Sequence, residues 1–187
     1  MSPLELLASL LVLINVVLVA RRSVLNYAFA IAGVAIYAIV FYRAKLYSDM
    51  LLQGFFLAVN LYGWRHWSRS LAAVGEVRVK RLTAQQRNIV AGWIVGATGV
   101  WGFTMHRLTD AALPYLDAGI AMGSIAAQIL LSRQKIENWV LWIVIDIVSI
   151  GMYAWKGLLP TAILYVLLLA VSIWGLIDWR RAEGKTK

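Results

Sequence analysis

Five polar and aromatic residues recur on one face of an apolar segment in the C-terminal third of the chain. The spacings between them are 3, 4, 3 and 4 residues, which places on one helical face Trp139, Trp142, Asp146, Ser149 and Tyr153. A carboxylate inside an apolar segment needs a compensating partner, and aromatic rings beside it attract cations through their π faces. The pattern therefore predicts a site for a flat, cationic aromatic ligand.

Three other apolar segments carry polar stripes at the same helical spacing. Their members are Gln53, Asn60, Trp64 and Trp67 in one segment, Asp117, Ser124 and Gln128 in another, and Tyr165 and Ser172 in the third. Polar groups are costly inside a membrane and usually face the protein interior or a water-filled cavity. We therefore expect four helices to line one cavity, with amide and hydroxyl groups that contact the polar edge of the ligand.

Asp146 is the single acidic residue well inside an apolar segment, whereas the other eight lie in loops or near segment ends. Three roles for its carboxyl group stay open: a hydrogen bond to a neighbouring helix, proton coupling, and contact with the substrate. The chain has no cysteine and two histidines, and no serine–histidine pair or second acid accompanies Asp146. We therefore expect no enzyme activity, no metal site and no cofactor.

Seven apolar segments position these residues. Of the 187 residues, 61% are hydrophobic and 14% are charged, against about 45–50% and about 25% in soluble domains. The mean hydropathy is +0.74, and a helix of about 20 apolar residues crosses a membrane. This composition excludes a disordered chain and predicts an all-α integral membrane protein with seven transmembrane helices. The segments are 4–20, 24–42, 46–64, 88–105, 112–131, 138–155 and 158–177.

The distribution of Lys and Arg predicts how the helices are oriented. Alternate loops sum to 4 basic residues on one side and 14 on the other, and the basic side faces the cytoplasm. The N-terminus is then outside and the C-terminus is cytoplasmic. We interpret the basic loop 65–87 as a topology determinant that contacts lipid headgroups, with docking of a cytosolic partner as the alternative. The net charge of +9 is thus explained without nucleic acid.

The chain contains an internal repeat. When the chain is aligned with itself so that Asn26 matches Asn138, Gly63 matches Gly175 and Trp67 matches Trp179. In this alignment nine of the 42 residues from 26 to 67 are identical to their counterparts. Helices one to three then repeat as five to seven, and helix four makes the two halves parallel. We predict repeat one at 1–67, a linker loop and helix at 68–107, and repeat two at 108–187, the three-plus-one-plus-three design of SWEET transporters.

The repeat is asymmetric at the predicted site. The polar residues of the sixth segment and their counterparts in the second are Trp142 and Ala30, Asp146 and Val34, and Ser149 and Tyr37. We therefore expect one asymmetric site, weighted toward the sixth helix. Trp67 and Trp179 end matching segments near the basic side, and we interpret them as anchors in the membrane interface.

Two runs of residues resemble the signatures of a known family. The first is Asn-Leu-Tyr-Gly-Trp-Arg-His-Trp at 60–67, preceded by Gln53, and the second is Lys-Ile-Glu-Asn-Trp-Val-Leu-Trp at 135–142, continuing to Asp146. The closing helices fit the same family through Tyr153, Lys156-Gly157-Leu158, Thr161-Ala162 and Tyr165. The runs resemble the third-helix and sixth-helix signatures of the PnuC family of vitamin transporters, and the likeness covers nearly the whole chain.

The resemblance implies a facilitator for nicotinamide riboside in the bacterial inner membrane, with a fold like that of a full-length SWEET. It implies downhill transport by alternating access, which becomes one-way when a cytosolic kinase phosphorylates the substrate. Some relatives carry thiamine, which is also a flat aromatic cation, so the residues leave these two substrates open. The substrate-binding subunit of a larger importer, docked through loop 65–87, is a further alternative, and a homo-oligomer also stays open.

The polar stripes and the resemblance together assign ten candidate substrate-binding residues. These are Gln53, Asn60, Trp64, Gln128, Trp139, Trp142, Asp146, Ser149, Tyr153 and Ser172. The site that they form is expected between the two halves, near the middle of the membrane.

Overall fold

The computed structural model describes residues 3–43, 47–109, 112–155, 157 and 159–185. Its helices are α1 (Pro3–Ala20), α2 (Asn26–Arg43), α3 (Tyr47–Val74), α4 (Ala84–Leu108), α5 (Pro114–Ser132), α6 (Glu137–Trp155) and α7 (Leu159–Lys185). Each predicted apolar segment coincides with one helix, so the all-helical prediction with seven helices is confirmed. Lys156 and Leu158, which carry part of the family resemblance, lie outside the described residues.

Among the described residues, four helices are long and apolar enough to cross a membrane by themselves: α4, α5, α6 and residues Thr161–Glu183 of α7. Within the described residues, α1 and α2 contribute the shorter apolar stretches Leu10–Ala20 and Asn26–Val40. The sequence of α3 is more polar because it contains Gln53 and Asn60 and ends in a charged segment. Two of the residues that lower its hydropathy, Gln53 and Asn60, therefore belong to the predicted polar stripe.

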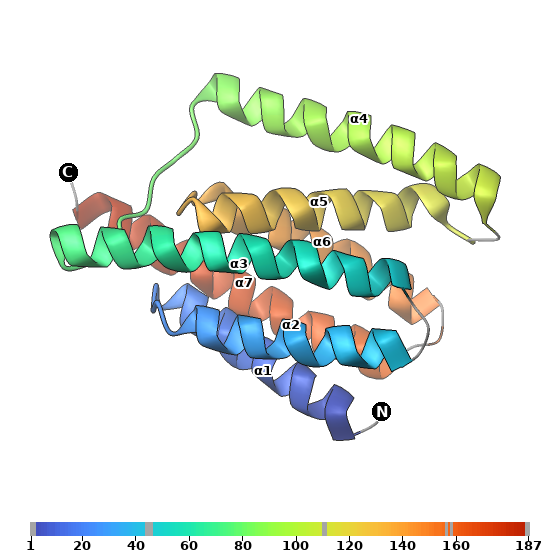
Figure 1. The fold of residues 1–187 in the computed structure, drawn as a ribbon. Coiled ribbons are helices and arrows are strands. Elements are labelled where there is room, and N and C mark those ends of the chain that lie inside the picture. Colours follow the sequence, from blue (N-terminus) through green and yellow to red (C-terminus); the bar gives the residue numbers. More distant parts are fainter. Residues whose placement is uncertain (1–2, 44–46, 110–111, 156, 158, 186–187) are drawn as a thin grey trace.

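Two groups of three helices pack side by side, and α4 lies outside them against α5 (Figure 1). Within the groups, α2 packs against α1 and α3, and α6 packs against α5 and α7. The groups meet where α1 contacts α7 and where α3 contacts α5. These two contacts are equivalent under the repeat, which maps α1 onto α5 and α3 onto α7. They support the division into 1–67, 68–107 and 108–187, which we retain as a proposal.

Two buried indole rings join the groups at one end of the bundle. The Nε1–H of Trp67 donates to the carbonyl of Leu131 at 3.2 Å, and the Nε1–H of Trp179 donates to the carbonyl of Val19 at 3.2 Å. Leu131 is itself the repeat counterpart of Val19, so the two bonds are equivalent. Both rings have 0% exposure. The interpretation of Trp67 and Trp179 as interface anchors is therefore wrong, because both rings pack in the protein core.

The turns that precede α2 and α6 also repeat. Arg22 and Gln134 have φ angles of 54° and 59°, in the left-handed region that side chains other than glycine rarely adopt. The side-chain amides of Asn26 and Asn138 then donate to the backbone carbonyl three residues earlier, at 2.7 and 2.6 Å. The same energetically costly turn occurs at equivalent positions in both halves. This indicates that each half needs the turn to set the direction of the helix that follows it.

The connection between α3 and α4 covers the same end of the bundle. Its buried side chains are Val77, Val79 and Leu82. The backbone of Lys80 pairs with the turn at 134–136, with N···O distances of 2.9 and 3.0 Å. Both carboxylate oxygens of Glu137, in the first turn of α6, accept the N–H of Leu82 at 3.0 Å. The loop expected at 65–87 is thus confined to 75–83, and its backbone is held against the second half of the chain.

Candidate substrate-binding site

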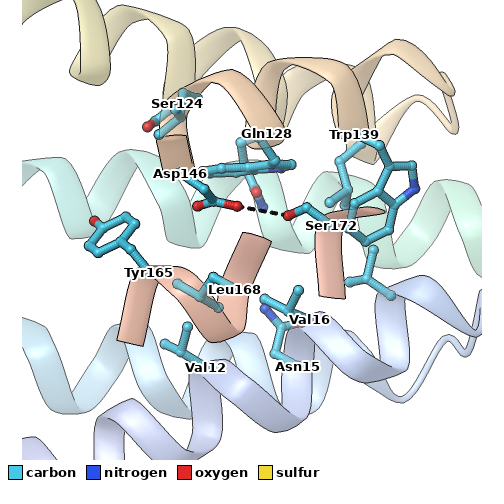
Figure 2. A pocket seen from close by; sticks show the side chains of 14 residues that line it. Val12, Asn15, Val16, Ser124, Gln128, Trp139, Asp146, Tyr165, Leu168 and Ser172 are labelled. Atoms are coloured by element: carbon cyan, nitrogen blue, oxygen red, sulfur yellow. Dashed lines mark hydrogen bonds between the residues drawn. The ribbon is translucent and has the colours of Figure 1, made fainter. Parts of the chain in front are cut away.

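A cavity of about 250 Å³ lies between α1, α5, α6 and α7 (Figure 2). Five of the ten predicted site residues line it: Gln128, Trp139, Trp142, Asp146 and Ser172. Asp146 is the one carboxylic acid among the described residues that line the cavity, and none of those residues is Lys, Arg or His. An ionised carboxylate at this position therefore lacks a cation of the protein as its partner.

The carboxyl group of Asp146 is held from the neighbouring helix. The hydroxyl of Ser172 in α7 donates to Oδ2 of Asp146 in α6 at 2.9 Å, and both residues are 2% exposed (Figure 2). Of the three roles considered for Asp146, a hydrogen bond to a neighbouring helix is present. A hydroxyl group fixes the position of the carboxylate but does not balance its charge. Substrate contact and proton coupling stay predictions.

Two indole rings of α6 bring aromatic surface to the cavity. Trp139 lies at the end where α6 begins, and its ring meets the ring of Trp179 edge to face, with centroids 5.7 Å apart. This contact places Trp139 between the cavity and the buried core at that end of the bundle. Trp142 is half-buried and lies one helical turn closer to Asp146. The cavity thus combines a carboxyl group with two aromatic rings, as the spacing in the sequence predicts.

A second cavity of about 200 Å³ lies between α1, α2, α3 and α5. Gln53 and Asn60 line it, and it shares Val12, Asn15 and Gln128 with the first cavity. The side-chain amide of Gln128 donates to Oδ1 of Asn60 at 3.0 Å. The structure therefore brings seven of the ten predicted residues to two adjoining cavities.

The other three predicted residues line neither of these cavities. Trp64 is 41% exposed, and Ser149 has no exposure. Tyr153 stacks on Tyr165, with ring centroids 5.3 Å apart and an interplanar angle of 27°. Because Tyr165 lines the first cavity, Tyr153 supports that wall from behind. Site roles for Trp64, Ser149 and Tyr153 stay predictions.

Asn15 and Tyr165 line the first cavity but are absent from the ten predicted residues. Tyr165 belongs to the polar stripe of the seventh segment, so its helical spacing from Ser172 was a usable signal. Asn15 is the one polar side chain in Leu10–Ala20, and a single residue has no periodicity. The signal that could have identified it is the cost of an amide inside a membrane.

Comparisons with known proteins agree on one family. A family model described as nicotinamide mononucleotide transporter matches residues 2–181. The nicotinamide riboside transporter PnuC of Escherichia coli (strain K12) is 29% identical over 205 residues, which cover 96% of this chain and 85% of that protein. A crystal structure of the vitamin B3 transporter PnuC matches with a TM-score of 0.79 and 31% identity, covering 98% of this chain and 83% of the other. The riboflavin/roseoflavin transporter RibM of Streptomyces davaonensis is 32% identical over 130 residues, or 68% of this chain and 61% of that protein.

Proposed function

The chain belongs to the nicotinamide mononucleotide transporter family of PnuC-type vitamin transporters, and from this premise we propose that it takes up nicotinamide riboside by facilitated diffusion. It is a multi-pass membrane transporter and not an enzyme. In the proposed mechanism the halves 1–67 and 108–187 rock against each other and expose the site to the two sides in turn. A cytosolic kinase then traps the riboside by phosphorylating it.

The proposal is carried by the buried carboxyl group of Asp146 in a cavity lined by no described cationic side chain. The pyridinium ring of nicotinamide riboside is flat and positively charged, so it supplies the missing countercharge. Trp139 and Trp142 add aromatic surface that a cation can approach. We assign binding of this ring to Trp139, Trp142, Asp146 and Ser172, and contact with the remainder of the substrate at the edge of this cavity to Gln128.

The same electrostatics favour the riboside over its phosphorylated form, although the family description refers to the mononucleotide. A phosphate group carries about two negative charges at neutral pH and is usually bound by Arg, Lys or a helix N-terminus. None of the described residues that line the two cavities is Arg or Lys. Asp146 would in addition repel a phosphate. The mononucleotide is therefore expected to bind more weakly than the riboside.

Thiamine and riboflavin are the alternative substrates within the family. Thiamine carries a thiazolium cation, which Asp146 would attract equally well. The relationship to a riboflavin/roseoflavin transporter favours a flavin as the second candidate. The isoalloxazine ring of riboflavin is neutral, however, and gives the buried carboxyl group of Asp146 no countercharge. The charge of the cavity thus favours a cationic vitamin.

We also propose that the basic end of the bundle faces the cytoplasm of a bacterium, with the N-terminus outside. Arg22 and Asp178 form an ion pair of 3.3 Å at this end, next to the buried rings of Trp67 and Trp179. The rings separate the first cavity from the basic end. In this conformation the substrate would leave toward the cytoplasm after the contact between the two halves opens there.

Calorimetric titration of the purified protein with nicotinamide riboside, thiamine, riboflavin and the mononucleotide tests the substrate. We expect saturable binding of the riboside, and the mononucleotide should bind at least about tenfold more weakly, a difference of about 1.4 kcal/mol. Preference for thiamine or riboflavin would support the assignment as a vitamin transporter but would change the assigned substrate.

Transport into proteoliposomes tests the mechanism: the riboside should equilibrate without a pH gradient and without a second protein. Accumulation driven by a pH gradient, or transport that requires a partner, would exclude the uniporter.

A further inference from the structure

The two cavities are related by the internal repeat. Seven residues of the second cavity are the repeat counterparts of seven residues of the first. The equivalent pairs are Val12 and Ser124, Gln128 and Val16, Ala30 and Trp142, Val34 and Asp146, Gln53 and Tyr165, Phe56 and Leu168, and Asn60 and Ser172. The helices agree as well, because the repeat converts the set α1, α5, α6 and α7 into α5, α1, α2 and α3. Each half of the chain thus contributes three helices to one cavity and one helix to the other, and the two cavities have the same design.

The chemistry of the two cavities has nevertheless diverged. The first cavity has a carboxyl group and indole rings, whereas the second has Val34 and Ala30 at the equivalent positions. The second cavity also has the uncharged amides of Gln53 and Asn60, at the positions equivalent to Tyr165 and Ser172. Each primary amide offers two donors and one acceptor oxygen without any charge. Such a lining suits hydroxyl groups, which both donate and accept. Its aromatic rings, Tyr37 and Phe56, are not accompanied by a carboxyl group that could balance the charge of a cationic ring.

We propose that the second cavity binds the polyhydroxyl part of the substrate while the first cavity binds its charged ring. The inference rests on the proposed function and deepens it, because it predicts a ligand made of two chemically different parts. For nicotinamide riboside the second part is the ribose. A site of this kind selects for a ring joined to a sugar or sugar alcohol over an equally charged ring that carries neither.

Asn15 in α1 is the residue that connects the two parts of the site. It lines both cavities, and its side chain points from α1 toward the first cavity (Figure 2). Its Oδ1 atom is buried and has no hydrogen-bond partner among the described residues. A buried acceptor without a partner costs free energy, which is recovered if the Asn15 amide turns its oxygen toward a hydroxyl donor of the ligand. The geometry therefore points to Asn15 as a substrate-binding residue at the junction of the ring and the sugar.

Gln128 occupies the same junction from the opposite side. It also lines both cavities, and its amide donates to Asn60 at 3.0 Å. This bond orients the Gln128 amide toward the second cavity. A sugar hydroxyl between Asn15 and Gln128 would thus meet amide groups from α1 and α5, one from each half of the repeat. Rocking of the halves would change the distance between these two contacts.

Comparison of two ligands separates the two parts of the site. Nicotinamide riboside carries both the ring and the ribose, whereas N1-methylnicotinamide carries the same cationic ring without the sugar. Their dissociation constants are measured by calorimetry for wild-type protein and for Asn15→Ala, Ala30→Leu and Trp142→Ala. Asn15→Ala removes the proposed sugar contact, Ala30→Leu reduces the space in the second cavity, and Trp142→Ala alters the ring cavity. Thermal melting in detergent establishes that each variant is folded.

We expect Asn15→Ala and Ala30→Leu to weaken binding of the riboside about tenfold, the effect of losing one or two hydrogen bonds. The same variants should leave N1-methylnicotinamide within about twofold of wild type, whereas Trp142→Ala should weaken both ligands. Equal weakening of both ligands by Asn15→Ala, or unchanged riboside binding in both second-cavity variants, would overturn the inference and leave the proposed function intact. Absence of riboside binding to the wild type would instead overturn the proposed function together with this inference.

Discussion

The indole rings of Trp67 and Trp179 lie against each other with their centroids 5.7 Å apart, although they come from different halves of the chain. Each is the repeat equivalent of the other, so the pair lies where the two halves meet. Tyr27 packs edge to face on Trp67, and Trp139 packs in the same way on Trp179. The four rings form a layer that closes the bundle between the first cavity and the basic end. In the proposed mechanism, transport through this end requires that the four rings separate.

Substitution of either indole by phenylalanine should destabilise the closed layer to a similar extent. Trp67→Phe and Trp179→Phe each remove one buried N–H···O=C bond of 3.2 Å between the halves. Loss of this hydrogen bond should lower the free energy of unfolding by about 1 kcal/mol, which lowers the melting temperature by a few degrees. Trp64→Phe is the matched control, because Trp64 is on the same helix but 41% exposed. A large effect of one variant and none of the other would contradict the equivalence of the two bonds.

Two glycines make the close packing of this layer possible. A methyl group on Gly63 would lie 2.5 Å from the hydroxyl oxygen of Tyr27 and 2.7 Å from its ring, and one on Gly175 would lie 2.5 Å from the ring of Trp139. Gly63→Ala and Gly175→Ala should therefore each destabilise the protein by roughly 1–3 kcal/mol, as overpacking does in protein cores. Gly54→Ala and Gly151→Ala are controls in the same two halves, because no atom lies within 4 Å of the added carbon. Thermal melting of the four variants measures the difference, and equal melting temperatures would exclude the steric explanation.

The helices could be predicted from the sequence because crossing a membrane requires long apolar runs. The ends of the helices on the aqueous side could not be predicted in this way. Hydropathy falls where a helix leaves the membrane, whereas the hydrogen bonds of α3 continue to Val74. The burial of Trp67 and Trp179 was also missed. A tryptophan at the end of an apolar segment is equally compatible with an interface anchor and with a buried ring, and the partner that decides between them lies in the other half of the chain.

The candidate site was predictable where it depends on one helix and less so where it depends on several. Trp139, Trp142 and Asp146 reach the cavity as their spacing predicts. Trp64 belongs to the polar stripe of α3, four residues after Asn60. Four residues turn an α-helix by roughly 40° more than a full revolution, so the side chain of Trp64 points in a direction different from that of Asn60, and Trp64 is partly exposed. The contribution of α1 to the site could not be predicted from helical periodicity, because Asn15 is a single polar residue in an apolar segment. It became visible when the fold placed α1 against α7 and beside both cavities.

Removal of the Glu137 carboxyl group should release the connection at 75–83. Glu137→Ala leaves the N–H of Leu82 without its acceptor, although the backbone pairing of Lys80 with 134–136 stays in place. Cleavage by trypsin after the exposed basic residues of this connection requires local opening, and a lost hydrogen bond to a charged group should accelerate it about tenfold. Glu183→Ala is the control, because its 2.6 Å ion pair with Arg81 is partly exposed and contributes little. Equal cleavage rates of the wild type and Glu137→Ala would contradict this role.

The same cleavage also tests the proposed orientation. Arg78, Lys80 and Arg81 lie in the connection at the basic end of the bundle. If this end is cytoplasmic, trypsin should cut the connection in inside-out membrane vesicles and leave it intact in right-side-out vesicles. Glu137→Ala raises the rate without changing the side, so it provides a sensitive form of the assay. Cleavage in right-side-out vesicles would reverse the assigned orientation of the helices.

The charge of Asp146 should decide whether a cationic ring binds. Asp146→Asn keeps the shape of the side chain and an oxygen that can accept the hydrogen bond from Ser172, so the protein should stay folded. The loss of a buried negative charge should weaken nicotinamide riboside about 10- to 100-fold, as expected for a charge-assisted contact. Ser172→Ala should weaken riboside binding less, about threefold, because it removes the group that positions the carboxylate but keeps the charge.

Asp117→Asn is the charge control, since Asp117 lies in the first turn of α5 and lines neither cavity. Calorimetric titration of the three variants measures the order. Unchanged binding to Asp146→Asn would mean that the carboxyl group is structural and that the ring binds elsewhere.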